Sequence, residues 1–407
     1  MNIVLLAGGV SNRFKPLNSK NFLNIGGYNL VDYNLAELEN LDFIENIFII
    51  HHPSFEQEFK EIKANHPHVV LVPQEFEGGM SGAILSLPDS LKDALVINVN
   101  DMLDPNFIVG FVDYIKQNSP KNLILGKRVN KHYPVGYLEI DDQNNLSNII
   151  EKPEKGSEPS DLINLVYHYF SDLERFKNLI RKTDLQDDSY ELALKVLAQE
   201  EEVKVFPYQG SWQTLKRPHM LIDMLKHLLK HNKVKTSLEN QIHETAIIEP
   251  SVKLGKNVKI DAYTILKGDT YIGDNSYVGS YTQIRDSHIG VDCLIGSNCE
   301  ITRSYVGDRV SMHANYFGDS FIGNDCFFGY GVTTANMRLD DKLINGEKKQ
   351  GATIGDGVKI ACHVLLNPGV KIGANTIITS KALICHDVEA NSYVKAKHEV
   401  DVRENKN

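Results

Sequence analysis

The chain has 407 residues, which exceeds the size of one ordinary domain and predicts two. Its formal net charge of −10 argues against a nucleic-acid partner, because contact with phosphate backbones needs concentrated Lys and Arg. The five cysteines form no CxxC pair, so neither a zinc site nor a disulfide framework is indicated. No apolar run approaches the roughly 20 residues of a membrane span, and no signal peptide is recognisable, so we expect a cytoplasmic protein without a membrane partner.

The first element in chain order is a buried strand predicted from Met1 to Ala7, followed at once by the loop 8–13. A strand that runs into a glycine-containing loop places backbone N–H groups at its carboxyl end, where open α/β sheets bind phosphates. Arg13 and Lys20 would add positive charge there. Because tight turns also use glycine for steric reasons alone, the loop by itself does not establish a phosphate site.

Strand-like and helix-like runs then alternate. The strand-like runs are 47–50, 69–72, 95–99 and 123–125, and the helix-like runs are 31–39, 54–64 and 105–117. This alternation predicts a parallel sheet covered by helices on both faces. Asp101 follows the run 95–100, at the expected carboxyl end of a strand, where a carboxylate either holds Mg²⁺ against a triphosphate or caps a turn.

Six motifs in this region occur in an order that resembles the sugar-1-phosphate nucleotidyltransferases. They are LAGGVSNRFKPLNSKNFLNIGG at 6–27, Gln74 with 78–83, Asn100-Asp101, Tyr133-Pro134-Val135-Gly136, the segment 150–153 with Asn164, and Gly210-Ser211-Trp212. The resemblance extends from residue 1 to about residue 230. It implies a Rossmann-like α/β nucleotidyltransferase domain, which we place at residues 1–233.

The resemblance also implies a reaction and its residues. The phosphate oxygen of a sugar 1-phosphate attacks the α-phosphorus of a nucleoside triphosphate, and pyrophosphate leaves, so charge neutralisation and alignment carry most of the catalysis. Arg13 and Lys20 would be catalytic, with Mg²⁺ on Asp101. The nucleotide-binding residues would be Leu6, Ala7, Gly8, Gly9, Gln74 and Gly79, and the sugar-phosphate-binding residues Gly136, Glu151 and Asn164. Since the amide of Gln74 both donates and accepts, it is compatible with the uracil of UTP and the thymine of dTTP.

Four positions depart from the family pattern. Ser11 stands where the family has Gly, Asn12 where it has Thr or Ser, Met80 where Thr is usual, and Thr214 near the expected second metal-binding Asp. Ser11 fits the turn only if φ stays negative or strain is accepted. Thr214 is a poor Mg²⁺ ligand. These departures leave open a slow enzyme, an altered substrate, or a regulatory domain that binds sugar nucleotides.

The last third of the chain contains a six-residue repeat of large apolar residues. They are Leu254, Ile260, Leu266, Ile272, Val278, Ile284, Ile289, Ile295, Ile301, Ile354, Ile360, Leu366, Ile372, Ile378 and Ile384. This period is typical of a three-sided parallel β-helix in which the aliphatic residue points inward. The repeat resembles the left-handed β-helix of hexapeptide acyltransferases, which implies a homotrimer with acyl-CoA between subunits. We therefore predict a left-handed β-helix acyltransferase-like domain at 234–407, and a trimerising stalk without chemistry is the alternative.

A second resemblance lies inside the repeat. Residues 313–323, 329–331 and 334–338 resemble the acetyltransferase half of the bifunctional enzymes that make UDP-N-acetylglucosamine, particularly the archaeal ones. It implies that His313 is the general base on a sugar amine, since neutral imidazole accepts a proton near pH 7. Arg303, Tyr316 and Lys349 would contact the sugar phosphate, and Ala361 and Ser380 would bind acetyl-CoA as co-substrate. His363 and His386 are alternative bases, and the polar segment 333–350 is predicted to be a loop over this site.

Three hypotheses follow from the sequence. The first is a bifunctional enzyme that acetylates an amino-sugar 1-phosphate and couples a sugar 1-phosphate to a nucleotide. The second keeps only nucleotidyl transfer, with the β-helix as an assembly element. The third is a regulatory subunit with a degenerate site, and the sequence leaves the base and the sugar open.

Overall fold

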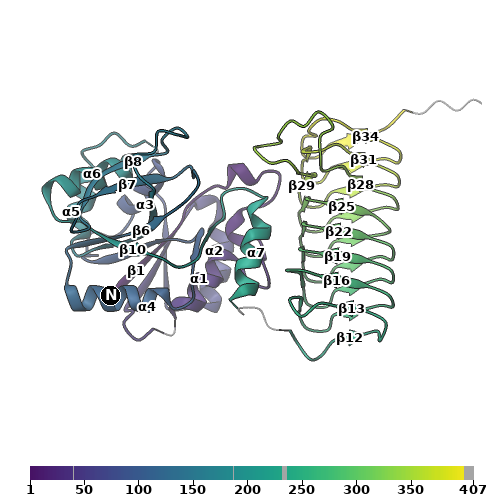
Figure 1. Cartoon of the computed structure of the whole chain (residues 1–407), viewed down its shortest axis with the longest axis horizontal. Coiled ribbons are helices and arrows are strands. Elements are labelled where there is room, and N and C mark those ends of the chain that lie inside the picture. The colour runs from purple at the N-terminus through teal and green to yellow at the C-terminus, as the bar shows by residue number, and fades with distance from the viewer. Residues whose placement is uncertain (40, 187, 232–235, 398–407) are drawn as a thin grey trace, which may run out of the picture. The chain divides into compact units, whose positions relative to one another are not determined.

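The computed structural model describes residues 1–39, 41–186, 188–231 and 236–397, and Figure 1 shows how their elements follow one another. Contacts divide the chain into two compact units. Unit 1 comprises Met1–Val10 and Leu30–Thr214, and unit 2 comprises Ser11–Asn29 and Leu215–Asn407. The domain boundary that the sequence predicts, at 233, lies outside the described residues.

Unit 1 is built on a mixed β-sheet. Its strands are β1 (Asn2–Ala7), β2 (Asn46–His51), β3 (Val69–Pro73), β4 (Ala94–Asn98), β6 (Asn122–Arg128), β7 (Gly136–Ile140), β8 (Leu146–Glu151), β9 (Leu162–Phe170) and β10 (Lys204–Tyr208). The main order is β10-β6-β9-β4-β1-β2-β3, with β7 on β8 and β9. A separate two-stranded ladder joins β5 (Asp101–Leu103) to β11 (Trp212–Thr214).

The prediction of a parallel sheet is confirmed for β4, β1, β2 and β3 and is wrong at β9. That strand runs antiparallel to both β4 and β6. A parallel pair needs a long crossover, usually a helix, and the chain forms no helix between β6 and β9. The hairpin of β7 and β8 instead returns the chain in the opposite direction, which places Asn164 of β9 beside Gly126 of β6.

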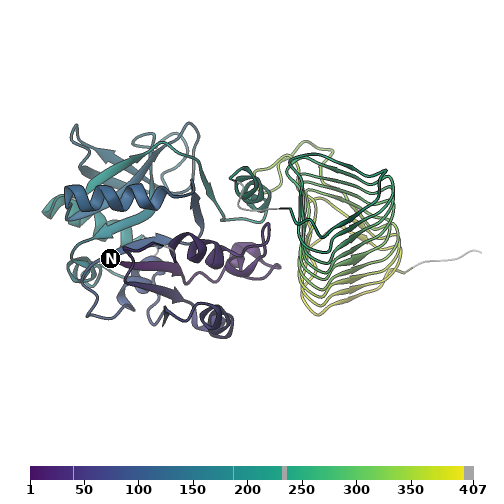
Figure 2. The same cartoon turned by 90° about the horizontal axis from the view of Figure 1, so that it is seen from below.

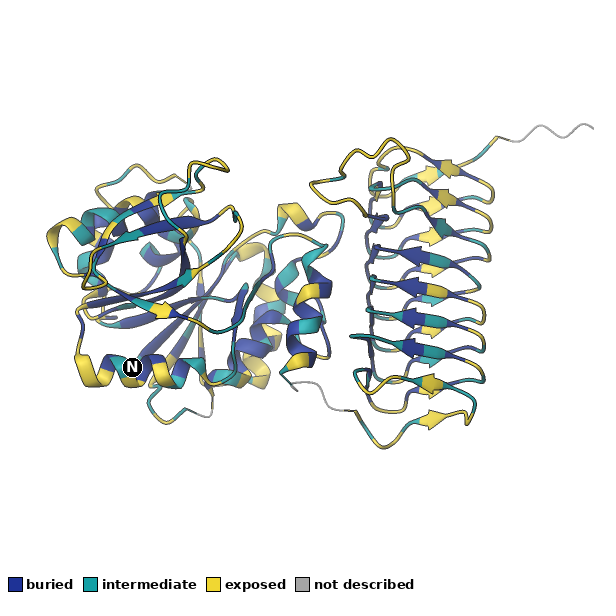
Figure 3. Cartoon of the chain, in the orientation of Figure 1, coloured by how far each residue is buried: buried dark blue, intermediate teal, exposed yellow. Residues whose placement is uncertain are grey.

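Six helices belong to the described residues of unit 1. They are α1 (Leu30–Leu38), α2 (Glu56–Asn65), α3 (Gly79–Leu85), α4 (Phe107–Asn118), α5 (Leu173–Ile180) and α6 (Ser189–Glu200), and a short 3₁₀ turn, η3 (Pro53–Phe55), precedes α2. The helix-like runs 31–39, 54–64 and 105–117 are thereby confirmed with small shifts at their ends. In Figure 3 the central strands β1 and β4 are buried while the helices expose their outer faces, as expected for helices that cover a sheet.

The β-helix of unit 2 has three parallel sheets, which we call its first, second and third faces. The first face is β12 (Gln241–Ile242), β15 (Lys259–Ile260), β18 (Tyr277–Val278), β21 (Leu294–Ile295), β24 (Ser311–Met312), β27 (Phe327–Phe328), β30 (Lys359–Ile360), β33 (Ile377–Ile378) and β35 (Tyr393–Val394). The second face is β13 (Ile247–Ile248), β16 (Ile265–Lys267), β19 (Gln283–Arg285), β22 (Glu300–Thr302), β25 (Tyr316–Gly318), β28 (Thr333–Thr334), β31 (Leu365–Leu366) and β34 (Leu383–Ile384). The third face is β14 (Lys253–Leu254), β17 (Tyr271–Ile272), β20 (His288–Ile289), β23 (Tyr305–Val306), β26 (Phe321–Ile322), β29 (Thr353–Ile354) and β32 (Lys371–Ile372).

The six-residue repeat is confirmed by burial. Every apolar residue of the predicted series, from Leu254 to Ile384, belongs to one core cluster inside the coils. Figure 2 looks along the stack and shows the coils superposed on one another, so each coil covers the apolar interior of its neighbour. Non-glycine residues at the turns repeatedly adopt φ between 48° and 62°, and Asn and Asp fill many of these positions because they tolerate left-handed backbone.

Unit 2 also contains the helix α7 (Met220–Lys230) and two 3₁₀ turns, η1 (Asn12–Phe14) and η2 (Lys20–Phe22). The predicted loop joins β28 to β29, and the backbone N–H of Gln350 donates to the carbonyl of Asn336 at its base, at 2.8 Å. Within the described ranges, none of the helices combines the length and apolar character that crossing a bilayer requires.

Candidate functional site

The residues that the sequence assigns to the nucleotide meet where β1 ends. Leu6 and Ala7 are its last two residues, and Gly8 follows. A Cβ added to Gly8 would lie 2.2 Å from Gln74 Oε1, so the Gln74 amide lies directly against this glycine. Gln74 Nε2 donates to the carbonyl of Gly79 at 3.2 Å. These positions therefore form one cluster at the carboxyl end of the central strand.

The residues beside Asp101 in the chain and in the ladder of β5 and β11 carry side-chain oxygens. This residue opens β5 and pairs with Thr214 of antiparallel β11, and its Oδ1 accepts a hydrogen bond from Trp212 Nε1 at 2.9 Å. Asn100 Oδ1 and Thr214 Oγ1 are buried, and neither has a hydrogen-bond partner among the described residues. One carboxylate and two neutral oxygens suit Mg²⁺, which prefers oxygen ligands. Waters and substrate phosphates usually supply the other ligands of this ion. Thr214 thus lies opposite Asp101 but contributes no charge.

The residues assigned to the sugar phosphate also meet. Gly136 of β7 pairs with Glu151 of β8. A Cβ added to Gly136 would lie 3.0 Å from Glu151 Oε2 and 3.5 Å from the Cβ of Asn164. Because glycine has no side chain, the space between the Glu151 carboxylate and Asn164 stays open. Glu151 Oε1 forms a salt bridge with Lys152 at 3.0 Å.

A buried relay behind Asn164 was missed by sequence reasoning. His168 Nε2 is 2.9 Å from Asn164 Oδ1, and His168 Nδ1 is 2.9 Å from the Tyr190 hydroxyl. Burial lowers the pKa of His168 to about 3, so the ring is neutral and carries one proton. With Asn164 Oδ1 as acceptor, that proton is on Nε2, and Tyr190 donates to Nδ1. The relay therefore turns the Asn164 amide so that its Nδ2 can donate to a ligand.

We expect Tyr190→Phe to weaken sugar-phosphate binding more than turnover. Loss of the hydroxyl removes the donor that fixes the His168 tautomer, and one neutral hydrogen bond contributes about 1 kcal/mol, so KM for the sugar 1-phosphate should rise by about three- to tenfold. Steady-state kinetics at varied sugar 1-phosphate measures this effect. The matched control is Tyr169→Phe, which removes a half-buried hydroxyl from β9, the strand that carries His168. Equal KM values in the two variants would contradict a positioning role.

Glu191 on α6 is a second feature that the sequence did not reveal. It is 6% exposed, and its Oε2 is buried without a hydrogen-bond partner among the described residues. Burial raises the pKa of Glu191 to about 8, and the nearby carboxylate of Glu151 adds to this effect. The Glu191 carboxyl is therefore protonated near pH 7, beside the charged group assigned to the sugar.

Because of this carboxyl group, we expect the free energy of unfolding to fall as pH rises. Below about pH 4.5 both the folded and the unfolded chain hold the Glu191 proton. Between 4.5 and about 8 only the folded chain holds it, so stability falls with pH by up to about 5 kcal/mol. Glu191→Gln should be the more stable protein near pH 8 and should lose this dependence. Urea unfolding followed by the fluorescence of the single tryptophan, Trp212 of unit 1, measures the difference, and parallel pH profiles of the two proteins would refute it.

Corner residues of successive coils align His313 with the positions assigned to acyl-CoA. The backbone N–H of His313 donates to Phe328, and that of Ala361 donates to Ile378, so the corners after β24, β27, β30 and β33 stack along the edge of the first face. Ser380 belongs to the last of these corners. His313 is exposed, and its ring lies 6.0 Å from that of Phe327. The alternative bases His363 and His386 are also exposed.

The predicted phosphate ligands of the β-helix lie in different surroundings. Arg303 is held by Asp319, with Nε–Oδ1 and Nη2–Oδ2 distances of 2.6 and 2.7 Å. Tyr316 lies in the next coil, where its hydroxyl would be 2.7 Å from a Cβ added to Gly318. Lys349 is exposed on the loop between β28 and β29. The Arg303 guanidinium is thus already neutralised by a bidentate ion pair, which lessens its capacity to bind a phosphate.

The signature segment with Arg13 and Lys20 belongs to unit 2. Ser11 has φ 54°, so of the two alternatives for this position the strained one is found. Its Oγ accepts a hydrogen bond from the Lys20 backbone at 3.2 Å and lies 3.2 Å from Ser19 Oγ. Lys20 Nζ donates to the carbonyl of Leu215 at 3.2 Å. The hydroxyl contacts offset part of the cost of left-handed backbone at a non-glycine residue.

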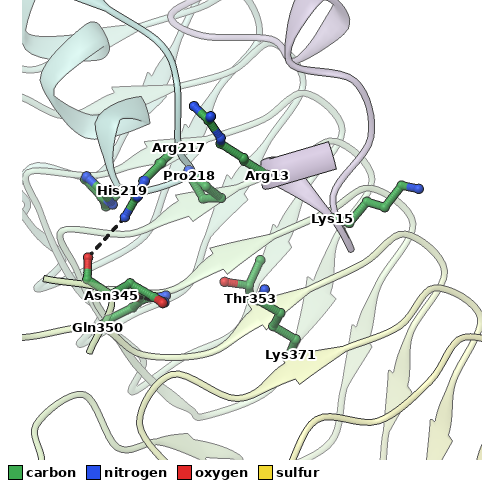
Figure 4. Close-up of a pocket in the computed structure, with 9 residues that line it drawn as sticks. All are labelled: Arg13, Lys15, Arg217, Pro218, His219, Asn345, Gln350, Thr353 and Lys371. Carbon is green, nitrogen blue, oxygen red and sulfur yellow. Dashed lines mark hydrogen bonds between the residues drawn. The ribbon is translucent and has the colours of Figure 1, made fainter. Parts of the chain in front are cut away.

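Arg13 lines a cavity of about 240 Å³ within unit 2 (Figure 4), which we call the cation pocket. Its lining residues are Arg13, Lys15, Arg217, Pro218, His219, Asn345, Gln350, Thr353 and Lys371. Four of these side chains are Arg or Lys, and no lining residue is acidic. The pocket thus concentrates positive charge at the segment that follows the loop 8–13.

Comparisons with known proteins bear on the family of the chain. A family model described as nucleotidyl transferase matches residues 2–231, and one described as GMPPB C-terminal domain matches residues 231–336. The bifunctional protein GlmU of Methanocaldococcus jannaschii is 29% identical over 425 residues, which cover 99% of each chain. A bifunctional sugar-1-phosphate nucleotidylyltransferase/acetyltransferase of Sulfurisphaera tokodaii is 29% identical over 426 residues, which cover 97% of this chain and 100% of that protein.

A solved structure of a putative glucose-1-phosphate thymidylyltransferase from Bacillus anthracis has a TM-score of 0.49 and 17% identity, and covers 57% of this chain and 96% of that one. The nucleotidyl transferase model covers more than half of the present sequence. The resemblance that the motifs predicted is therefore confirmed. The chain belongs to the nucleotidyl transferase family, as a nucleotidyltransferase enzyme whose C-terminal part folds as a β-helix.

Proposed function

We propose that this protein transfers a nucleotidyl group from a nucleoside triphosphate, UTP or dTTP, to a sugar 1-phosphate and releases pyrophosphate. The observation that carries the proposal is Gly136, whose missing side chain leaves space beside Glu151 Oε2 and Asn164. A carboxylate that accepts and an amide that both donates and accepts suit the hydroxyl groups of a sugar ring. The cluster of Gly8, Gln74 and Gly79 supports a nucleotide beside the same sheet.

The chemistry needs alignment and charge neutralisation more than proton transfer. In the proposal the cations of Arg13 and Lys20 offset negative charge on the phosphates as pyrophosphate departs. Asp101, with the oxygens of Asn100 and Thr214, would hold Mg²⁺, which supplies further positive charge to the triphosphate. Hydrogen bonds that the sugar hydroxyls donate to Glu151 and share with the Asn164 amide would fix the sugar, so that its phosphate oxygen lies in line with the leaving group.

The direct test is pyrophosphate release from UTP, dTTP, CTP and GTP, each with a panel of hexose and N-acetylhexosamine 1-phosphates, with and without Mg²⁺. We expect turnover with UTP or dTTP and one sugar class, dependent on Mg²⁺. If no pair of substrates gives pyrophosphate release, and circular dichroism shows that the protein is folded, a regulatory domain that binds sugar nucleotides without turning them over is favoured.

A second activity, acetylation of an amino-sugar 1-phosphate from acetyl-CoA, is supported by the β-helix. The specific observation is the alignment of His313, Ala361 and Ser380 along one edge of the first face. If acetyl-CoA binds along these stacked corners, a general base at one end of them can act where the thioester reacts. The name of the Sulfurisphaera tokodaii relative includes an acetyltransferase, and the name of the Methanocaldococcus jannaschii relative calls it bifunctional. Acetyl-CoA-dependent release of free CoA with glucosamine 1-phosphate tests it, and no release above the rate without protein would exclude it.

The proposal includes assembly as a cytoplasmic homotrimer. Outward apolar side chains are exposed on the first face, with Leu294, Phe327 and Ile377 between 41% and 49% exposed. Ser311 and Lys359 alternate with them across the sheet, and apolar side chains exposed on a flat sheet favour contact with another copy of the chain. Light scattering coupled to size-exclusion chromatography measures the assembly, and a monomer at micromolar concentration would contradict it.

A further inference from the structure

The ladder of β5 and β11 is short and stands apart from the main sheet of unit 1. It runs from the pair of Asp101 and Thr214 at one end to the pair of Leu103 and Trp212 at the other. Two strands alone are marginally stable in water, so a ladder of this length needs further contacts to hold its register. Such contacts lie just beyond Leu103, in the residues that follow β5 and precede β11.

A carboxylate closes this end of the ladder. Asp104 Oδ2 accepts a hydrogen bond from the backbone N–H of Ser211 at 2.9 Å, and its Oδ1 accepts one from the Ser211 hydroxyl. The Tyr208 hydroxyl accepts a hydrogen bond from the backbone N–H of Asp104 at 2.9 Å and donates to the carbonyl of Ser211 at 2.5 Å. These hydrogen bonds join the end of β5 to the start of β11, and we call Asp104, Tyr208 and Ser211 the Asp104 clamp.

The Asp104 clamp is anchored to the main sheet. Tyr208 is the last residue of β10 and pairs with Lys127 of β6. Lys127 Nζ donates to the carbonyl of Gly210 at 2.5 Å and lies 5.2 Å from the centre of the Tyr208 ring. A Cβ added to Gly210 would lie 1.9 Å from Asp104 Oδ2, so the turn fits against this carboxylate only with glycine at position 210. The clamp therefore ties the small ladder to β10 and β6.

The residue after the Asp104 clamp contacts Asp101. Trp212 directly follows Ser211, and its Nε1 donates to Asp101 Oδ1 at 2.9 Å. A hydrogen bond to one carboxylate oxygen fixes the direction in which the carboxylate presents the other. The register of the ladder also sets Thr214 opposite Asp101. A displacement of Ser211 would therefore move both the indole and the hydroxyl that lie beside this carboxylate.

We propose that Asp104 is a positioning residue for the Mg²⁺ site assigned to Asp101: it holds β11 in register, so that Trp212 orients the Asp101 carboxylate and Thr214 stays opposite it. This inference rests on the proposed nucleotidyl transfer, which gives the metal its role. Asp104 acts without touching the metal, since its two oxygens accept from Ser211. Loss of an outer partner of a metal ligand costs about 10- to 100-fold in metal affinity or activity.

The test compares Asp104→Ala and Asp104→Asn with the unmodified protein. Asp104→Ala removes both acceptors, whereas Asp104→Asn keeps an oxygen for the Ser211 N–H and gains an amide that can donate to the Ser211 hydroxyl. The first measurement is acrylamide quenching of Trp212, the single tryptophan, without nucleotide, sugar or Mg²⁺. In Asp104→Ala the quenching constant should rise by about twofold or more, because a loosened ladder opens the indole to solvent. In Asp104→Asn it should stay close to that of the unmodified protein.

The second measurement is the Mg²⁺ concentration that gives half the maximal rate of pyrophosphate release. It should rise by about 10- to 100-fold in Asp104→Ala and by less than about threefold in Asp104→Asn. Asp113→Ala, which removes an exposed carboxylate from α4, is the matched control and should change neither measurement. Circular dichroism melting shows which variants fold. If Asp104→Ala does not fold, Tyr208→Phe, which removes only the hydroxyl of the Asp104 clamp, takes its place with the same expected direction.

The outcomes separate the Asp104 clamp from the reaction that it serves. Equal quenching and equal Mg²⁺ dependence in Asp104→Ala and Asp113→Ala would overturn the proposal. A lower melting temperature with unchanged Mg²⁺ dependence would also overturn it, because the clamp would then act on stability alone. If the unmodified protein releases no pyrophosphate, nucleotidyl transfer itself is contradicted, and a difference in quenching would then assign the clamp to the fold of the ladder only.

Discussion

Asp101→Asn is expected to lower Mg²⁺-dependent pyrophosphate release by about a hundredfold or more. Asp101 supplies the charge in a donor set whose other buried oxygens, from Asn100 and Thr214, are neutral. Its loss removes several kcal/mol of charge stabilisation from the reacting phosphates. Asn keeps the size of the side chain and the contact with Trp212, so folding should change little. The initial rate of pyrophosphate release over a range of Mg²⁺ concentrations gives the result.

Thr214→Asp tests the same centre in the opposite direction. A second carboxylate opposite Asp101 should raise Mg²⁺ affinity by about tenfold or more. Without Mg²⁺ the two buried carboxylates repel each other, so the melting temperature should fall, and added Mg²⁺ should restore it. Thr214→Val, which keeps the shape but lacks the oxygen, is the control and should bind Mg²⁺ more weakly. If the melting temperature of the Thr214→Asp protein does not change when Mg²⁺ is added, the metal binds elsewhere.

His313→Ala is expected to lower acetyl transfer by about 10²- to 10⁴-fold, the usual contribution of a general base. Nucleotidyl transfer should be unchanged, because His313 belongs to the β-helix of unit 2 while the nucleotide and sugar clusters belong to unit 1. Both rates are measured on one preparation, as release of free CoA and release of pyrophosphate. That pairing separates loss of the base from loss of folded protein.

His363→Asn is the control for the base. His363 has φ 57°, and Asn tolerates this left-handed backbone, so the exchange removes the imidazole without adding strain. Its acetyl transfer should match that of the unmodified protein. The reverse outcome, with His363→Asn inactive and His313→Ala active, would place the base two coils further along the stack, in the corner after β30.

The β-helix could be predicted almost completely from sequence, because each inward residue is set by a local period. The mixed sheet of unit 1 was harder, since the direction of β9 depends on the absence of a crossover helix rather than on its own residues. The pairing of Arg303 with Asp319 is an intermediate case. Thr302 pairs with Gly318, so the register of β22 and β25 already places the next two residues side by side.

Sequence motifs supplied the residues that we assign to the proposed ligands, but not the residues packed behind them. His168 follows Asn164 by four residues on one strand, and alternation puts both on the same face, which is a usable signal. Tyr190 and Glu191 reach the same region only through the packing of α6 against β8. Burial there keeps the Glu191 carboxyl protonated near pH 7, and no local pattern in the sequence encodes that environment.

The closed base of the loop between β28 and β29 makes the loop an insertion that leaves the stacking of the coils unchanged. Its ends are joined by the hydrogen bond from Gln350 to Asn336, and β28 pairs with β31 as if nothing intervened. Lineages can therefore lengthen, shorten or replace this loop without moving any inward residue of the coils. A change in the length of this loop would therefore alter what lies over the neighbouring coils while the apolar interior of the stack stays packed.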